Sequence, residues 1–127
     1  MRSALRIGMA AAWLSFAGIA SADLINPGFE TGDFSNWSTF GSGWRIGGGG
    51  DAYEGDYGAV NDVLTSDGDN WRGVFQNTAV VAGNTYSAGV YIRAVALESS
   101  QSWFELQWLD ADNGVIGQLQ SATVSSD

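Results

Sequence analysis

The sequence contains no cysteine and no histidine, and each absence excludes a class of chemistry. Without cysteine the fold has no disulfide bond, so core packing or a bound ion must hold it together. Without histidine there is no Ser-His-Asp triad, and the ordinary zinc ligands are missing. Lysine is absent too, which removes another common nucleophile and base. We therefore expect no enzyme of the usual nucleophilic or acid–base kinds.

Basic charge is scarce, and it is unevenly placed. All five basic residues are arginines. Two of them, Arg2 and Arg6, precede residues 7–20, an uncharged and mostly apolar run. Ala20 and Ala22 then have the small-x-small spacing of a signal-peptide cleavage site. The run is shorter than the roughly 20 residues that a bilayer span needs. The sequence therefore predicts a secretory signal peptide over residues 1–22 and a secreted or cell-surface domain over residues 23–127, with no membrane span.

The expected mature segment is strongly acidic. It keeps three arginines against all fourteen acidic residues, which gives it a net charge of −11. Such a surface repels phosphate backbones and anionic membranes, so nucleic acid is excluded as a partner. An excess of carboxylates does suit a calcium-containing medium, because Ca²⁺ prefers oxygen ligands. A length of 105 residues fits one domain with one core.

Alternating apolar and polar residues predict strands after residue 23. Residues 85–95 and 102–110 alternate most clearly, and Phe104, Leu106 and Trp108 are expected in the core together with Trp37. Shorter strands are expected at residues 37–40, 43–46, 57–61, 71–80 and 115–120. Turn compositions fall at residues 81–84 and 110–114, and the second turn should close a hairpin. The pattern predicts an all-β fold, an antiparallel β-sandwich or jelly roll.

Residues 26–37, NPGFETGDFSNW, resemble the opening of carbohydrate-binding modules of the family 4/9 type, with its Asn-x-Gly-Phe-Glu pattern followed by Trp. Residues 75–94 and 104–116 are similar to later parts of that family, in the same order. The resemblance implies a galactose-binding-domain-like jelly roll that binds a polysaccharide or a cell-surface glycan. The same opening resembles bacterial secreted proteins, some with a surface-sorting tail, so a structural or adhesive surface domain is the alternative.

Domains of this family continue with closing strands beyond the point where this sequence stops. We therefore expect either a fragment or a sandwich that lacks an edge strand, and we favour a fragment. A sheet left open in this way would expose unpaired backbone groups and promote association.

The resemblance also implies a structural calcium ion. The family commonly uses the Glu of Gly-Phe-Glu as a ligand, and carried onto this chain that residue is Glu30. Asp51, after the glycine run, is the expected second ligand, whereas the family's acid from the final strand has no counterpart here. Residues 67–70, DGDN, have an Asp-x-Asp spacing that could hold a second ion, but a polar turn is favoured.

Five tryptophans in the mature segment exceed what the core of a small sandwich needs. Flat aromatic faces cover the C–H surfaces of sugars, while neighbouring polar groups meet the hydroxyls. If strands 85–95 and 102–110 pair, one outer face gathers Tyr91, Arg93, Trp103, Glu105 and Gln107. Trp44 and Trp71 stand near loops as further candidates. Glycosidases need two facing carboxylates, and the spacing of the acids singles out no such pair. We expect a non-catalytic binding module, with any hydrolase domain lying outside this chain.

Overall fold

The computed structural model describes residues 2–8, 12–13, 22–62, 71–94 and 101–125, with side chains from residue 22 onward. The predicted fold class is confirmed: the chain is all-β and its strand pairs are antiparallel, consistent with a β-sandwich. The strands are β1 (Arg2–Gly8), β2 (Ala12–Trp13), β3 (Ser38–Phe40), β4 (Trp44–Gly48), β5 (Tyr57–Asn61), β6 (Gly73–Val81), β7 (Gly89–Val90), β8 (Gln101–Ser102), β9 (Glu105–Leu109), β10 (Val115–Gln120) and β11 (Val124–Ser125). A short 3-10 turn, η1 (Gly49–Asp51), follows β4.

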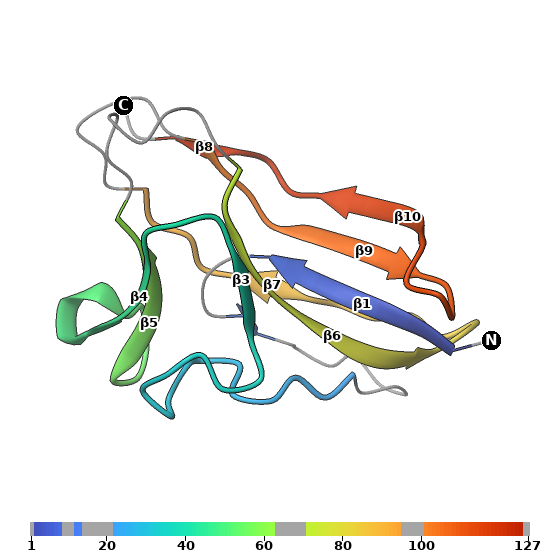
Figure 1. The fold of residues 1–127 in the computed structure, drawn as a ribbon, viewed down its shortest axis with the longest axis horizontal. Helices are drawn as coiled ribbons and strands as arrows, with labels where there is room; N and C mark the ends of the chain where they lie inside the picture. Colours follow the sequence, from blue (N-terminus) through green and yellow to red (C-terminus); the bar gives the residue numbers. More distant parts are fainter. Residues whose placement is uncertain (1, 9–11, 14–21, 63–70, 95–100, 126–127) are drawn as a thin grey trace.

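One large sheet dominates the molecule (Figure 1). Its strand order is β10-β9-β1-β6-β3, and the remaining strands form the two-stranded ladders β4-β5, β2-β7 and β8-β11. The hairpin between β9 and β10 is closed as predicted, because Asp110 Oδ1 accepts the N–H groups of Asp112 at 2.9 Å and Gly114 at 2.7 Å. Among the described residues, no helix is both long and apolar enough to cross a membrane.

The N-terminal residues provide the central strand of this sheet. β1 pairs antiparallel with β6 on one side and with β9 on the other. The sequence predicts a leader here and no strand, so β1 is an addition to the predicted set. β6 and β9, which flank β1, also place side chains in the core. They pair in turn with the outer strands β3 and β10.

The core lies between the large sheet and a second layer of chain. Val74 and Val80 of β6 and Phe104 beside β9 are buried, together with Phe29 and Trp37 from the segment that follows residue 22. Leu106 and Trp108 are half-buried against this cluster, so the predicted core positions on that strand are confirmed. The second layer contributes Trp44, Ile46, Ala59, Tyr86, Ala88, Val90 and Ile92.

One expected strand pairing is wrong. Within the described residues 85–94 only β7 is a regular strand, and it pairs with β2, whereas β9 pairs with β1 and β10. The alternation itself is correct, since Tyr86, Ala88 and Val90 all pack against the core. They do so from the second layer, which is why this segment does not lie beside β9.

The opening motif is a compact structural unit. Phe29 is fully buried and its ring lies 4.9 Å from that of Trp37, whose Nε1–H donates to the Asn26 carbonyl at 2.8 Å. Asn26 and Phe29 adopt left-handed backbone conformations, with φ of 54° and 63°. Such a conformation is rare for a bulky residue, and the surrounding packing holds it in place.

Gln76 of β6 fastens this unit to the sheet. Its side chain is only 7% exposed. Its Oε1 accepts the Ile25 N–H at 2.7 Å, and its Nε2 donates to the carbonyls of Ile25 at 2.9 Å and Asn36 at 2.8 Å. A buried amide with three hydrogen bonds specifies the position of the segment, because the polar atoms of the Gln76 side chain would otherwise be buried without partners.

Candidate functional site

Two stacked tyrosine rings lie at the surface. The rings of Tyr53 and Tyr91 are 3.6 Å apart between centroids and inclined by 12°, and the residues are 66% and 47% exposed. Tyr53 stands in the loop between η1 and β5, and Tyr91 directly follows β7. The stack therefore joins two parts of the chain that are far apart in sequence and presents aromatic surface to solvent.

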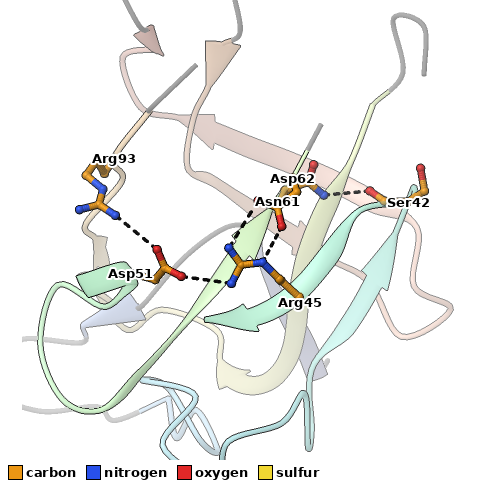
Figure 2. Close-up of polar contacts among 6 residues, drawn as sticks. All are labelled: Ser42, Arg45, Asp51, Asn61, Asp62 and Arg93. Atoms are coloured by element: carbon orange, nitrogen blue, oxygen red, sulfur yellow. Dashed lines mark hydrogen bonds and ion pairs between the residues drawn. The ribbon is translucent and has the colours of Figure 1, made fainter. Parts of the chain in front are cut away.

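Asp51, two residues before Tyr53, contacts two arginines (Figure 2). Its Oδ2 accepts from Arg45 Nη1 at 3.1 Å, and its Oδ1 lies 3.7 Å from Arg93 Nη2. Arg45 also donates from Nε to Asp62. We call Tyr53, Tyr91, Asp51, Arg93 and Arg45 the tyrosine–arginine patch.

Titration in the patch follows from these contacts. Hydrogen bonds from the guanidinium group to Asp62, and then to Asp51, raise the pKa of Arg45 above its usual value. The pKa of the Tyr53 phenol is raised as well, first by its hydrogen bond with Tyr91. Both groups therefore keep their protons at neutral pH, and the patch offers hydroxyl, guanidinium and carboxylate groups beside an aromatic surface.

A second aromatic pair is formed by Trp71 and Trp103. Their rings meet edge to face, with centroids 5.3 Å apart and planes 78° apart. Trp71 is 76% exposed and Trp103 is half-buried. Both rings thus have surface in reach of a ligand. Trp44 differs, because it packs partly against the core and donates from Nε1 to the Phe40 carbonyl at 3.0 Å.

The five residues expected to share one face are divided by the fold. Tyr91 and Arg93 belong to the tyrosine–arginine patch, and Trp103 contacts Trp71. Glu105 and Gln107 lie on β9 and hydrogen-bond to each other. They alternate with Leu106 and Trp108, which pack against the core, so they lie on the opposite face of β9, where both are half-buried. The expected single patch depended on a strand pair that does not form.

Glu30, the expected calcium ligand, holds a turn. Its carboxylate accepts the N–H of Asp56 at 3.0 Å and of Tyr57 at 3.5 Å. Gly55 permits this contact, because a Cβ there would come within 2.2 Å of Glu30 Oε1. Across the described part of the chain, no three acidic side chains gather into a cluster of the kind that holds a metal. Residues 67–70 lie outside the described residues.

Asp51, the other expected calcium ligand, contacts two arginines in this structure. Both of its oxygens face guanidinium groups, which would compete with a cation. Because the groups around the Asp51 carboxylate are cationic, this surrounding does not fit a calcium ligand. Glu30 does fit, because its carboxylate is exposed, meets only N–H groups and keeps further lone pairs for an ion.

Sequence reasoning missed Tyr53 and Arg45. Tyr53 lies in a glycine-rich loop where no alternation marks a face, and Arg45 lies in a short strand read only as a scaffold. The one signal for Tyr53 is the Asp-x-Tyr spacing at 51–53, which matches the Tyr-x-Arg spacing at 91–93 across the contact.

Comparison of the chain with protein-family models, with curated proteins and with solved structures finds no match. The functional argument therefore depends on the geometry of the chain itself.

Proposed function

We propose that this chain is a secreted, non-catalytic domain that binds a polysaccharide or cell-surface glycan at the tyrosine–arginine patch. The observation that supports this most directly is the stacked pair of Tyr53 and Tyr91, both exposed, beside charged groups that already contact each other. The resemblance of the opening motif to carbohydrate-binding modules points to the same class of ligand.

The mechanism is adsorption without bond breaking. A pyranose ring places its C–H face on an exposed tyrosine ring, where apolar contact is favourable. Its hydroxyls then donate to Asp51 and accept from Arg93, as sugars do with carboxylate and guanidinium groups. Because the ion pair between Asp51 and Arg93 restrains both side chains before binding, less side-chain entropy is lost on binding.

Trp71 and Trp103 supply a second aromatic surface for a longer chain. The exposed ring of Trp71 suits another sugar unit, and Glu105 and Gln107 on β9 are polar groups of the right kind. A polysaccharide that contacts both aromatic pairs gains affinity from two linked contacts.

Calcium is part of this proposal, with Glu30 as its ligand. The ion would add to the turn that Glu30 already fastens through Asp56 and Tyr57, and so would stabilise a domain without disulfides. The expected result is a higher melting temperature in calcium than in chelator, with the difference lost in Glu30→Gln. Equal melting temperatures for the unaltered chain would remove the ion from the proposal.

The glycan site is tested by isothermal calorimetry of the full chain against soluble plant, algal and microbial polysaccharides. Tyr91→Ala should lower the affinity at least tenfold. Phe40→Ala is the matched control, because both residues are 47% exposed and Phe40 lies on an edge strand outside the patch. Unchanged affinity in a folded Tyr91→Ala protein, or an equal loss in the control, would reject the site.

A structural or adhesive surface domain is the second candidate, and one observation favours it. Edge strand β10 exposes Val115, Ile116 and Leu119 at 51%, 62% and 62%. An exposed apolar edge is a surface for association with other protein. Absence of binding across the whole polysaccharide panel, with concentration-dependent association, would favour this candidate.

A further inference from the structure

The two phenol groups of the stacked tyrosines lie at the same end of the stack. The rings of Tyr53 and Tyr91 are 3.6 Å apart between centroids and 12° from parallel, and their hydroxyls hydrogen-bond to each other. A centroid distance this short leaves little lateral offset between the rings. The ring carbons ortho to the two hydroxyls therefore face each other across the stack.

This arrangement occurs at one place among the described residues. All four tyrosines of the sequence lie in that part of the chain, and no other two of them are in ring contact. Both rings of the stack are also open to a dissolved reagent, because Tyr53 is 66% exposed and Tyr91 is 47% exposed. The pair thus combines close approach of two phenols with access from solvent.

We propose that Tyr53 and Tyr91 form an oxidative cross-linking site, where hydrogen peroxide and a haem peroxidase join the two rings as dityrosine. Each phenol gives up one electron and one proton, and the two phenoxyl radicals form a bond between their ortho carbons. The ortho hydrogens then return to the oxygens, so the pair loses two hydrogen atoms in all. Hydrogen peroxide accepts these two electrons and two protons and becomes two molecules of water.

The structure around the stack favours coupling within one molecule. Asp51 and Arg93, each two residues from a tyrosine of the stack, approach to 3.7 Å and so hold the same two segments together (Figure 2). The rings must turn from face to face into an edge-joined pair as the bond forms. The loop that carries Tyr53 begins with Gly49 and Gly50, where nothing lies within 4 Å of a Cβ position, so it has room to shift.

The cross-link would give this chain a covalent bond that cysteine cannot provide. It would join the loop after η1 to the segment after β7, which the described residues hold together through side-chain contacts such as the stack and the ion pair. A bond that closes a loop of about forty residues restricts the unfolded chain as a disulfide of the same span does. The inference goes beyond the proposed function, because it depends on the stack and not on glycan binding.

The test treats the full chain, at low concentration, with a haem peroxidase and hydrogen peroxide. The expected product is a monomer that has lost two hydrogen atoms by intact mass and has the blue fluorescence of dityrosine. Digestion should give a linked peptide that contains Tyr53 and Tyr91. The formal charge of −9 opposes coupling between molecules. The linked monomer should melt at least about 8 °C above the untreated chain.

Three variants identify the reacting residues. Tyr53→Phe and Tyr91→Phe should each lower the yield of linked monomer at least tenfold, because phenylalanine keeps the ring but cannot form a phenoxyl radical. Tyr57→Phe is the matched control and should leave the yield unchanged, because Tyr57 is also exposed, at 38%, and lies outside the stack. All three substitutions keep the aromatic ring, so the fold should persist, which circular dichroism checks.

Four results would overturn the proposal. Dityrosine found only in covalent dimers would mean that coupling occurs between molecules. Addition of oxygen to tryptophan, without loss of hydrogen, would mean that exposed indoles such as Trp71 consume the oxidant. An equal loss of yield in Tyr57→Phe would place the reaction outside the stack, and an unchanged melting temperature of the linked monomer would reject the stabilising role. None of these readouts uses a sugar, so the glycan proposal can fail while the cross-link stands, and the reverse also holds.

Discussion

Replacing Gln76 by leucine should detach the opening motif from the sheet. The change keeps the volume of the side chain but removes three hydrogen bonds, at 2.7, 2.9 and 2.8 Å, to the backbone of Ile25 and Asn36. A buried hydrogen bond contributes about 1 kcal/mol net, so the expected loss is about 3 kcal/mol. For a domain of this size each kcal/mol corresponds to about 4–8 °C, which gives a drop in melting temperature of about 12–24 °C.

Two measurements follow this change. Urea unfolding gives the loss of free energy, and hydrogen exchange read by mass spectrometry shows whether the amides of residues 24–37 lose protection first. The matched control is Asn77→Ala, the next position on β6, whose side chain is exposed and should change stability by less than about 0.5 kcal/mol. A loss below about 1 kcal/mol in Gln76→Leu, with residues 24–37 still protected, would refute the role given to Gln76.

Two further predictions concern the loops. Gly55→Ala should destabilise the fold by about 1–2 kcal/mol in urea unfolding, because φ is 80° there and a Cβ would meet Glu30 Oε1, whereas Gly50→Ala, in open space, should be nearly neutral; equal effects would contradict this reason. The pKa of Asp33 is lowered, chiefly by its hydrogen bond with Ser35, so the carboxylate stabilises the fold above its unfolded pKa near 3.8 and loses that contribution as pH falls through the lower folded value. The urea midpoint of Asp33→Asn should accordingly change less with pH below 4 than that of the unaltered chain, and identical pH profiles would exclude the contact as a source of acid sensitivity.

Local patterns predicted the strands well, because alternation and turn composition depend only on short stretches of sequence. The prediction of residues 57–61 and 115–120 agrees with β5 and β10, and the expected turns follow β6 and β9. The burial of Trp37 and Phe104 was predicted for the same reason. Periodicity gives the two faces of a strand, however, and it does not name the neighbour. The segment around Tyr91 was therefore placed beside β9, although it lies in the other layer.

The candidate site was less accessible to sequence reasoning. Asp51 meets Arg93 and Tyr53 meets Tyr91 across about forty residues, and nothing local marks such a contact. The backbone conformation of Phe29 was not predicted either. It is left-handed, which is unusual for an aromatic residue, and tertiary packing imposes it. The hydrogen bonds of Gln76 to the opening motif were also not predicted, because a single polar residue inside a strand pattern does not reveal its partners.

Strand β10 has a consequence for the behaviour of the protein in solution. Its apolar side chains lie on an open edge, while the chain as a whole carries a formal charge of −9. Mutual repulsion between molecules keeps such edges apart at low ionic strength and neutral pH. Salt shortens the range of that repulsion to about 10 Å at 0.1 M, and acid removes it by protonating the carboxylates. Dilute, neutral, low-salt buffer is therefore the condition in which single molecules should persist, and concentrated acidic or saline samples should become turbid.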